Sequence, residues 1–539
     1  MIDENILYKL RLYLIIILAL FIQLFNFNLK EVYHIDELFS YGMANNQTGV
    51  YIHKEIADID NKLVKSEVFH DYLTQTPNSS YKKMWNQLSY DCHMPLYFLI
   101  LRFVNSFFPP QFTNAPGIIV NCIVLFFLLI SFYYLSQKIF KDKEIALASL
   151  ALFAFSSHIL SLEVYVRMYL LQTCLSVFLI LKTIELLDTT KAKNSLLVSI
   201  MFLSLINILT HFYSIIFCFT ITLSGFVVLL KQKRHNDLIK FLFVMLLSAI
   251  FAYVIFPEMI KMGTEGERGG QFVSILKEYT KVPLMLLKRQ LPLFMESFFV
   301  YQPLCVIAII LSVIIFHKSF KKDIVTSREK QILSFFSVLF FVYGILVTLV
   351  MPNMTSYKIR YFAPIIPVFF ILLFQILISL KRLLNLKNIT FYCFIWLIVG
   401  IIGFYEALHQ DSPFYLRGTD KSRRTERLVQ NADIWWGLGG GKRHSWIIYG
   451  FVDKLAKAKN VWTLVDLESK EFLKFANEGK KNGRYAYLFM PKTQEQNPTG
   501  GEIWVEETTN RKAYYLYTLK HEKTASMAIE ASIYLVAPY

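Results

Sequence analysis

The sequence is poor in charged residues and in cysteine. Only 18% of its 539 residues are Asp, Glu, Lys or Arg, whereas a soluble protein carries about 25%. The six cysteines form no Cys-x-x-Cys pair and most lie in apolar runs, so neither a zinc site nor a disulfide framework is indicated. No phosphate-binding glycine loop, no strand-linked Gly-x-Gly-x-x-Gly and no clear short repeat is present, which argues against an ATP-driven machine.

Hydrophobic residues make up 55% of the chain, gathered into runs long enough to cross a bilayer, which takes about 20 residues. We therefore predict an α-helical polytopic membrane protein over residues 1–406. The first run, 10–27, lacks a small-residue cleavage site and predicts a retained helix rather than a removed signal peptide. Further spans are expected near 117–137, 145–161, 166–186, 195–212, 213–230, 239–256, 292–316, 331–351, 361–380 and 389–406. With the short apolar stretch 95–108, the expected total is 11 to 13.

The formal net charge of +16 has a topological explanation. Many Lys and Arg residues lie in short loops between apolar runs, as the positive-inside rule requires, and no nucleic-acid recognition motif is present. We therefore expect a bilayer rather than a nucleic acid as the partner. The loops 138–143, 191–193, 231–235, 317–322 and 381–387 are predicted to be cytoplasmic. This orientation places 28–92, 257–291, 352–360 and everything beyond 406 outside, as in a bacterial cytoplasmic-membrane protein with an extracytoplasmic active site.

Three outer segments need separate interpretation. The stretch 95–108 has both ends outside, so either it is a partial or re-entrant helix or the loop 138–143 breaks the charge rule. Segment 28–92 is too long for a structureless loop, and 51–73 predicts surface helices. The glycines of loop 257–291 are typical of a mobile lid.

The region 407–539 predicts a small extracytoplasmic α/β domain. Strand-like runs at 461–467, 484–490 and 513–519 alternate with a helix-like run at 468–481.

The adjacent acidic residues Asp36 and Glu37 are the sharpest candidate for chemistry. Two carboxylates at a membrane surface are most often solvated charge. A carboxylate fixed beside a membrane helix can instead act as a general base that takes the proton of an attacking hydroxyl. Spacing alone leaves both interpretations open.

Two further motifs lie at the same predicted face. His93 precedes Pro95 where the outer segment re-enters the membrane; the proline can simply start a helix, or the imidazole can bind substrate or phosphate. Glu163 and Arg167 are four residues apart, which predicts one helix face. They either satisfy each other as an ion pair or bind an anionic group and sugar hydroxyls, since charges at the edge of a span are costly.

Two later motifs complete this set. His211 and Tyr213 lie at an outer turn, where interfacial aromatic residues are ordinary. Lys358 and Arg360 precede a span on the side where the charge rule disfavours cations, which favours phosphate binding. Each signal is weak alone. The orientation derived from other residues puts all five motifs on one face, so we expect them to line one outer cavity.

The motifs resemble those of the GT-C superfamily of polyprenyl-phosphate-sugar-dependent glycosyltransferases, in particular the protein O-mannosyltransferase and lipid A aminoarabinose transferase group. The acidic motif after the first span is matched by Asp36–Glu37. A His-Pro-Pro-Leu-Tyr-like motif is matched by 93–97, which ends at Tyr97, with Met94 in place of the first proline. Glu163, Arg167 and Tyr169 match a Glu-x-x-x-Arg-x-Tyr pattern. The later elements are matched by His211 and Tyr213 and by Arg360-Tyr361 with Pro364 and Pro367.

The resemblance covers about residues 1–405 and implies inverting sugar transfer from a lipid-phosphate donor. It implies Asp36 as general base, with Glu37 supporting it or binding the acceptor. Arg167, Lys358 and Arg360 would neutralise the leaving phosphate, with Arg268 or Lys261 of the lid as further candidates. His93, Tyr97, Glu163, Tyr169, His211 and Tyr213 would line the substrate site. No cofactor is required, although a divalent ion bridging carboxylate and phosphate is compatible with the pattern.

The acceptor, whether protein, lipid or polysaccharide, is not specified by the sequence. A transporter or flippase for a lipid-linked substrate is the alternative, and it predicts charged residues in mid-span and repeat symmetry. A scaffold whose C-terminal domain does the binding is a third interpretation. It would leave the outer cluster without a purpose.

Overall fold

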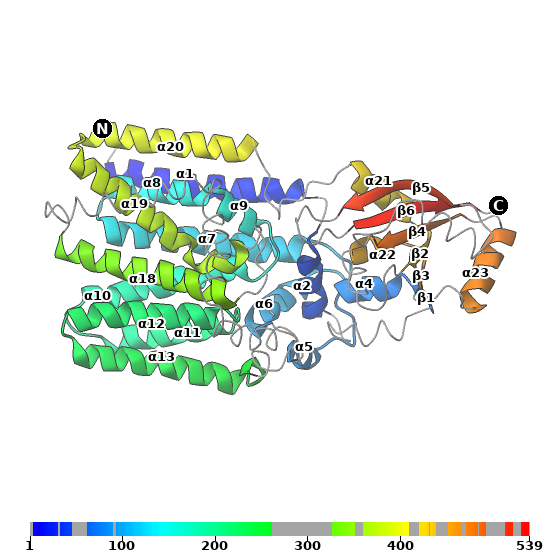
Figure 1. Ribbon diagram of the computed structural model, residues 1–539, viewed down its shortest axis with the longest axis horizontal. Helices are drawn as coiled ribbons and strands as arrows, with labels where there is room; N and C mark the ends of the chain where they lie inside the picture. The colour runs from blue at the N-terminus through cyan, green and yellow to red at the C-terminus, as the bar shows by residue number, and fades with distance from the viewer. Residues whose placement is uncertain are drawn as a thin grey trace, which may run out of the picture.

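The computed structural model describes residues 4–30, 33–45, 62–89, 93–260, 326–350, 359–408, 420–430, 432–437, 451–464, 470–482, 485–491, 513–520 and 530–537. A bundle of long helices occupies one end of the molecule and a mixed sheet the other, with short helices between them (Figure 1). The predicted fold class, a helical multi-pass membrane protein with a C-terminal α/β region, is confirmed.

The long helices are apolar enough to cross a bilayer. Within the described residues seven meet this condition: Ile6–Asn28, Ala115–Phe140, Tyr169–Asp188, Ser214–Lys231, His235–Ile255, Ser327–Leu349 and Arg360–Leu383. The pair Lys143–Ala154 and Ser157–Glu163, bent by 57°, raises the number to eight if it is one span. The expected span 292–316 lies outside the described residues.

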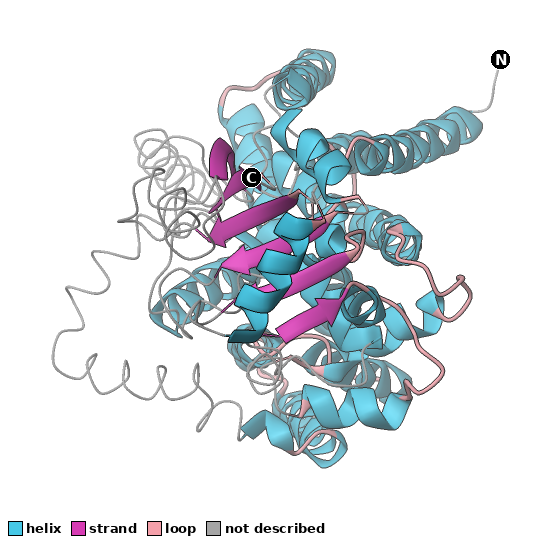
Figure 2. Cartoon of the chain, turned by 90° about the vertical axis from the view of Figure 1, so that its right-hand side faces the viewer, coloured by secondary structure: helices cyan, strands magenta, loops and turns pink. Residues whose placement is uncertain are grey.

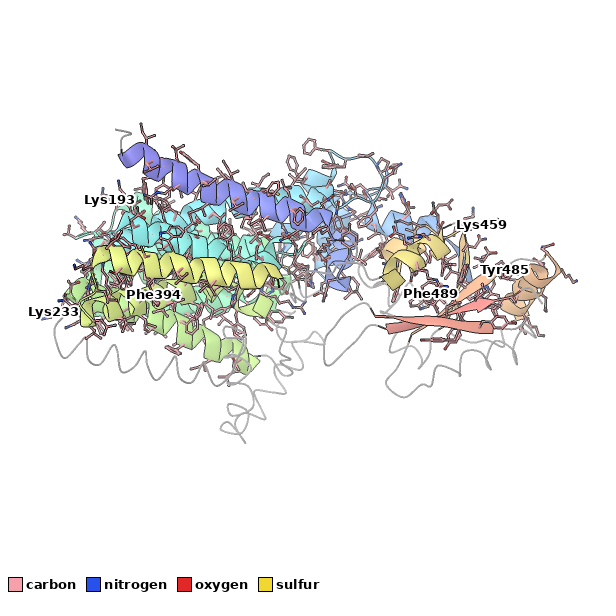
Figure 3. All side chains as sticks on the ribbon, turned by 90° about the horizontal axis from the view of Figure 1, so that it is seen from above. Lys193, Lys233, Phe394, Lys459, Tyr485 and Phe489 are labelled. Carbon is pink, nitrogen blue, oxygen red and sulfur yellow. The ribbon has the colours of Figure 1, made fainter. Side chains whose placement is uncertain are left out.

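The bundle consists of α1 (Glu4–Asn28), α7 (Ala115–Phe140), α8 (Lys143–Ala154), α9 (Ser157–Glu163), α10 (Tyr169–Asp188), α11 (Asn194–Ile208), α12 (Ser214–Lys231), α13 (His235–Ile255), α18 (Ser327–Val350), α19 (Ile366–Leu383) and α20 (Asn388–Leu408). A 3₁₀ turn, η1 (Ile359–Ile365), leads into α19. Lys193 and Lys233, from two of the loops predicted to be cytoplasmic, lie at the end of the bundle opposite the sheet, which carries Lys459 and Phe489 (Figure 3).

A layer of short helices separates the bundle from the sheet (Figure 1). It contains α2 (Ile35–Asn45), α4 (Glu67–Leu73), α5 (Tyr81–Leu88) and α6 (Pro95–Asn105). With 11 residues, α6 is too short to span a bilayer, and it packs against α2 and α7. The ambiguous stretch 95–108 is therefore a partial helix at the end of the bundle near the sheet, and the basic loop 138–143 need not break the charge rule.

The sheet has the order β1-β3-β2-β4-β6-β5. Its strands are β1 (Lys62–Lys65), β2 (Asp433–Gly437), β3 (Asn460–Leu464), β4 (Ala486–Pro491), β5 (Ala513–Lys520) and β6 (Glu530–Val536). β3, β2 and β4 run parallel, while β1, β6 and β5 pair antiparallel. Helix α23 (Lys470–Lys481) lies across one face (Figure 2), where Phe472 packs on Trp435 and Trp462. The expected strands at 461–467, 484–490 and 513–519 and the helix at 468–481 correspond to β3, β4, β5 and α23.

One strand comes from an unexpected place. The run 62–65 was expected to be helical, as part of 51–73, but it forms β1 and pairs with β3 across almost 400 residues of sequence, with Val64 opposite Val461. The sheet therefore includes part of the outer segment 28–92 as well as the region after 407. On the face opposite α23, Trp436 packs against Phe451, which directly precedes α22 (Val452–Leu455), and α22 contacts α4.

Candidate functional site

The site is built on the first turn of α2, at the end of the bundle that faces the sheet (Figure 1). The backbone N–H of His34 donates to Glu37 Oε2 at 2.8 Å, an arrangement like a capping box that fixes the helix start. Two carboxylates in the first turn also suit the positive end of the helix dipole. Because successive helical residues are about 100° apart, Asp36 and Glu37 point in different directions.

Asp36 faces an arginine and a tyrosine from distant parts of the chain. Arg360 Nη1 donates to Asp36 Oδ2 at 2.5 Å, and the Tyr165 hydroxyl donates to the same oxygen at 2.9 Å. Arg360 Nη1 also donates to Tyr165 Oη at 2.9 Å. The Asp36 side chain keeps 21% of its surface exposed, so this carboxylate is held in place yet open on one side.

The charges around Asp36 decide its protonation. Burial by itself raises the pKa of Asp36, but Arg360, Arg167 and His34 and the hydrogen bond from Tyr165 outweigh burial and hold that pKa well below its usual range. Burial and the neighbouring Asp36 charge raise the pKa of Tyr165 well above its ordinary value. Asp36 is therefore an anion at neutral pH, and Tyr165 keeps the proton that it donates.

Glu37 faces the interior. Its side chain has no exposed surface and lies 2.5 Å from Lys30 Nζ. Its Oε1 accepts the backbone N–H of Val166 at 2.8 Å. Burial lowers the pKa of Lys30, and the charge of Glu37 opposes that shift. Glu37 was expected to support the base or bind the acceptor; in the structure its carboxylate is buried among Lys30, His34 and Val166.

The prediction that Glu163 and Arg167 share a helix face is wrong. Helix α9 ends at Glu163 and α10 begins at Tyr169, so the two residues flank a break between helices. The Glu163 carboxylate lies against α1, where it accepts from Asn26 Nδ2 at 3.4 Å. Glu163 is therefore part of the packing between helices rather than of the cluster around Asp36.

Arg167 joins α2 to the start of α6. Its Nη1 donates to Ser40 Oγ at 3.2 Å. Its Nη2 lies 2.6 Å from His93 Nε2, which must be the acceptor because a guanidinium carries only donors. Pro95 occupies the first turn of α6 as predicted. The Tyr97 hydroxyl is buried without a hydrogen-bond partner among the described residues.

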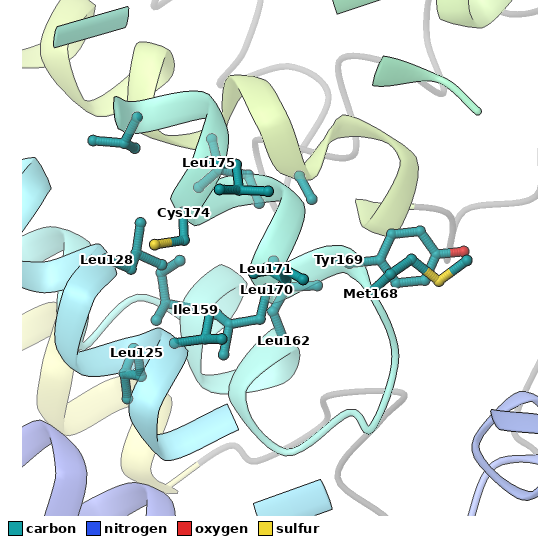
Figure 4. Close-up of a cluster of buried hydrophobic side chains, with 14 of the residues drawn as sticks. Leu125, Leu128, Ile159, Leu162, Met168, Tyr169, Leu170, Leu171, Cys174 and Leu175 are labelled. Atoms are coloured by element: carbon teal, nitrogen blue, oxygen red, sulfur yellow. The ribbon is translucent and has the colours of Figure 1, made fainter. Parts of the chain in front are cut away.

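Aromatic rings form a wall beside the carboxylate. The Tyr165 and Tyr169 rings are parallel, with 5.9 Å between their centroids. The ring centroids of Tyr169 and His211 are 5.2 Å apart. The Tyr361 ring packs against both Tyr169 and Tyr213, at centroid distances of 6.0 and 5.3 Å. Tyr169 points away from the apolar cluster formed by Leu125, Ile159 and Leu162 (Figure 4). That cluster fixes the helix start from behind, and the aromatic faces are left to line the site.

The structure thus brings Asp36, His93, Arg167, Tyr169, His211, Tyr213 and Arg360 together at one end of the bundle. Lys358, Arg268 and Lys261, with loop 257–291 beyond residue 260, lie outside the described residues. Within the described ranges, no three His, Cys, Asp or Glu side chains are grouped as metal ligands.

Sequence reasoning missed His34, Ser40 and Tyr165 as members of this cluster, whereas Tyr361 was noted only as part of the Arg360-Tyr361 motif. Each lies within four residues of a predicted site residue. Their positions inside the motifs were the signal, because a polar side chain beside a motif residue at a helix end shares its surroundings.

Comparison with known proteins gives structural neighbours only. No protein-family model matches the chain, and no curated protein matches it. Among solved structures, ArnT from Cupriavidus metallidurans bound to undecaprenyl phosphate is similar over 97% of both chains, with 10% identity and a TM-score of 0.46.

Two archaeal structures are also similar. An oligosaccharyltransferase from Archaeoglobus fulgidus, in complex with zinc and sulfate, matches over 88% of this chain and 68% of its own, with 11% identity and a TM-score of 0.40. AglB from the same organism, in complex with an inhibitory peptide and a dolichol-phosphate, matches over 89% and 69%, with 10% identity and a TM-score of 0.43.

Proposed function

We propose that the protein is an integral membrane glycosyltransferase that moves a sugar from a polyprenyl-phosphate donor to an acceptor hydroxyl at the outer face. The observation that carries this proposal is the Asp36–Arg360–Tyr165 cluster, an oriented carboxylate anion bonded to one guanidinium group, with the charge of a second, Arg167, nearby. A base for the acceptor and cations for a phosphate are the two requirements of this reaction.

The reaction is a single displacement. The acceptor oxygen forms a bond to the anomeric carbon while the bond from that carbon to the phosphate oxygen breaks, with inversion. Asp36 takes the proton of the acceptor hydroxyl through its open side. The polyprenyl phosphate leaves with its electron pair, and its negative charge is stabilised by Arg360 and by Arg167. Oriented cations stabilise charge well where little water competes.

The contacts of Arg360 suggest an order of events. Arg360 is bonded to Asp36 and Tyr165, so an incoming phosphate competes with the carboxylate for the same guanidinium. When the donor takes Arg360, the pKa of Asp36 rises and the carboxylate becomes a better proton acceptor. The base is therefore activated once the donor is bound.

The remaining residues fit binding roles. The rings of Tyr169, His211, Tyr213 and Tyr361 offer apolar faces with polar tips, a surface suited to a sugar ring. His93, held by Arg167, lies at the edge of the same cluster. The proposed donor carrier belongs to the class of lipid that is bound in the ArnT structure.

The test compares cells that lack the protein with cells that carry the wild type, Asp36→Asn or Asp71→Asn. Asp71 is an exposed aspartate of α4 and serves as the matched control. Mass spectrometry of lipid, protein and polysaccharide glycans is expected to find a sugar that the wild type and Asp71→Asn add and Asp36→Asn does not. Purified Asp36→Asn protein should still bind undecaprenyl phosphate. Ordinary transfer by Asp36→Asn would remove the base assignment, and an unchanged set of glycoconjugates would remove the transferase itself.

A further inference from the structure

The break between α9 and α10 is held from behind by side chains of other elements. Asn121 Nδ2 of α7 donates to the backbone oxygens of Glu163 and Tyr165, at 2.9 and 3.1 Å. Lys30 Nζ donates to the oxygen of Val164 at 2.6 Å. Polar side chains thus supply hydrogen bonds to backbone oxygens of a turn that lies between two helices.

The Lys30–Glu37 ion pair is central to this arrangement. Both side chains are essentially without exposed surface, at 1% and 0%. Lys30 binds the oxygen of Val164 while Glu37 accepts the N–H of Val166, so the pair contacts the turn on both sides of Tyr165. Burying two charges is costly for stability. We therefore attribute to this pair a role in positioning the turn rather than in stabilising the fold.

The front of the same turn carries the chemistry. Tyr165 donates to Asp36, and Arg167 contacts Ser40 and His93. Val164 and Val166 are fully buried, and packing at Val166 is tight, because a Cβ on Gly117 would lie 2.5 Å from its Cγ1. A displacement of the turn would move Tyr165 and Arg167 together.

We propose that Lys30 and Glu37 are positioning residues, which fix the 164–167 turn so that Tyr165 and Arg167 keep their places beside Asp36. The proposal rests on the proposed function for the meaning of Asp36. In this proposal Glu37 does not contact substrate, because its carboxylate oxygens accept hydrogen bonds from Lys30, Val166 and His34. One carboxylate of the pair serves the reaction and the other aligns the turn.

The charges around Asp36 define the expected signature. Arg360 faces it from η1, Tyr165 and Arg167 from the turn, and His34 from the segment before α2. Loosening the turn removes the contributions of Tyr165 and Arg167 while Arg360 and His34 stay. The pKa of Asp36 must then rise, which a generally destabilised protein would not show.

The test uses Glu37→Gln, Lys30→Met and the double variant Lys30→Met/Glu37→Leu in lipid nanodiscs. Infrared titration, taken as the difference between each protein and the same protein with Asp36→Asn, reports the protonation of Asp36. All three changes are expected to move this titration to higher pH and to lower sugar transfer about 100-fold, as misplacement of reacting groups does. Adding Tyr165→Phe to Glu37→Gln should shift the titration by less than the sum of the two shifts.

Lys454→Met is the control, because Lys454 in α22 is, like Lys30, a buried lysine with an acidic partner, here Asp453. It should leave the Asp36 titration unchanged. If the single variants fail to insert, the double variant, which leaves no unpaired charge, gives the answer. An unshifted Asp36 titration would overturn the proposal, as would a rise in acceptor KM alone, which would make Glu37 an acceptor ligand. Ordinary transfer by Asp36→Asn would instead remove the base assignment, and an unchanged set of glycoconjugates would remove the transferase itself, so these failures are distinct from failure of the positioning role.

Discussion

Replacing Arg360 with glutamine tests the core of the site. Arg360 and Asp36 are only 16% and 21% exposed, so their attraction is screened less than that of a surface pair. At an effective dielectric constant of about 20, opposite charges about 4 Å apart attract by about 4 kcal/mol. Loss of one preoriented group that stabilises the departing charge costs about 100- to 1,000-fold in kcat, or about 2.7–4 kcal/mol. We expect Arg360→Gln to fall in that range and to weaken binding of undecaprenyl phosphate.

The same variant has a second, independent consequence for pH. Because Arg360 lowers the pKa of Asp36, its removal must move the acid limb of kcat/KM to higher pH. The assay is a pH series of sugar transfer with the acceptor identified by glycan analysis, with Arg360→Lys as the control that keeps the charge. A lysine supplies one point charge without the planar fork, so it should restore the acid limb better than kcat. An Arg360→Gln protein with near wild-type kcat and an unmoved acid limb would refute the reasoning.

Two further predictions concern the supports of the site. Gly117→Ala should lower the free energy of unfolding by about 1–3 kcal/mol and reduce transfer further than that loss explains, because the new Cβ would lie 2.5 Å from Val166 and 2.6 Å from Tyr41 Oη. Thermal melts are compared with those of Gly400→Ala, whose Cβ meets nothing within 4 Å. Equal effects of the two substitutions would contradict this prediction. Arg102→Met should lower the free energy of unfolding by about 1–3 kcal/mol and leave the acid limb of kcat/KM in place, since Arg102 Nη1 caps the end of α2 at the backbone oxygen of Ala44, 2.7 Å away. The exposed Lys82→Met is the control. A moved acid limb in Arg102→Met would count against this prediction.

The outer cluster could be predicted from sequence because charged loops report topology. The motifs at residues 36, 93, 167, 211 and 360 were placed on one face by the basic loops, and the structure brings them together. The direction of Glu37 could not be predicted, because one residue along a helix changes the direction by about 100° and the helix start was unknown.

Two other features escaped prediction for different reasons. The break after Glu163 has no glycine or proline to mark it, and it is held by side chains from α1, α2 and α7 and from the α1–α2 connection, which local sequence does not show. The strand β1 is four residues long and pairs with a partner almost 400 residues away. A short run in a charged segment takes its conformation from that partner rather than from its own propensity.

The site residues share a structural origin that explains why the cluster lies where it does. Asp36 lies in the first turn of α2, His93 precedes α6, Arg167 lies between α9 and α10, and Arg360 lies in the turn before α19. Mid-span positions pack against neighbouring helices or face lipid, where a charge is costly. Helix ends at a bilayer surface combine free backbone groups with access to water, so charged side chains are less costly there than in mid-span. In the function proposed above, this is the depth at which the phosphate of a lipid-linked donor would meet Asp36, Arg167 and Arg360.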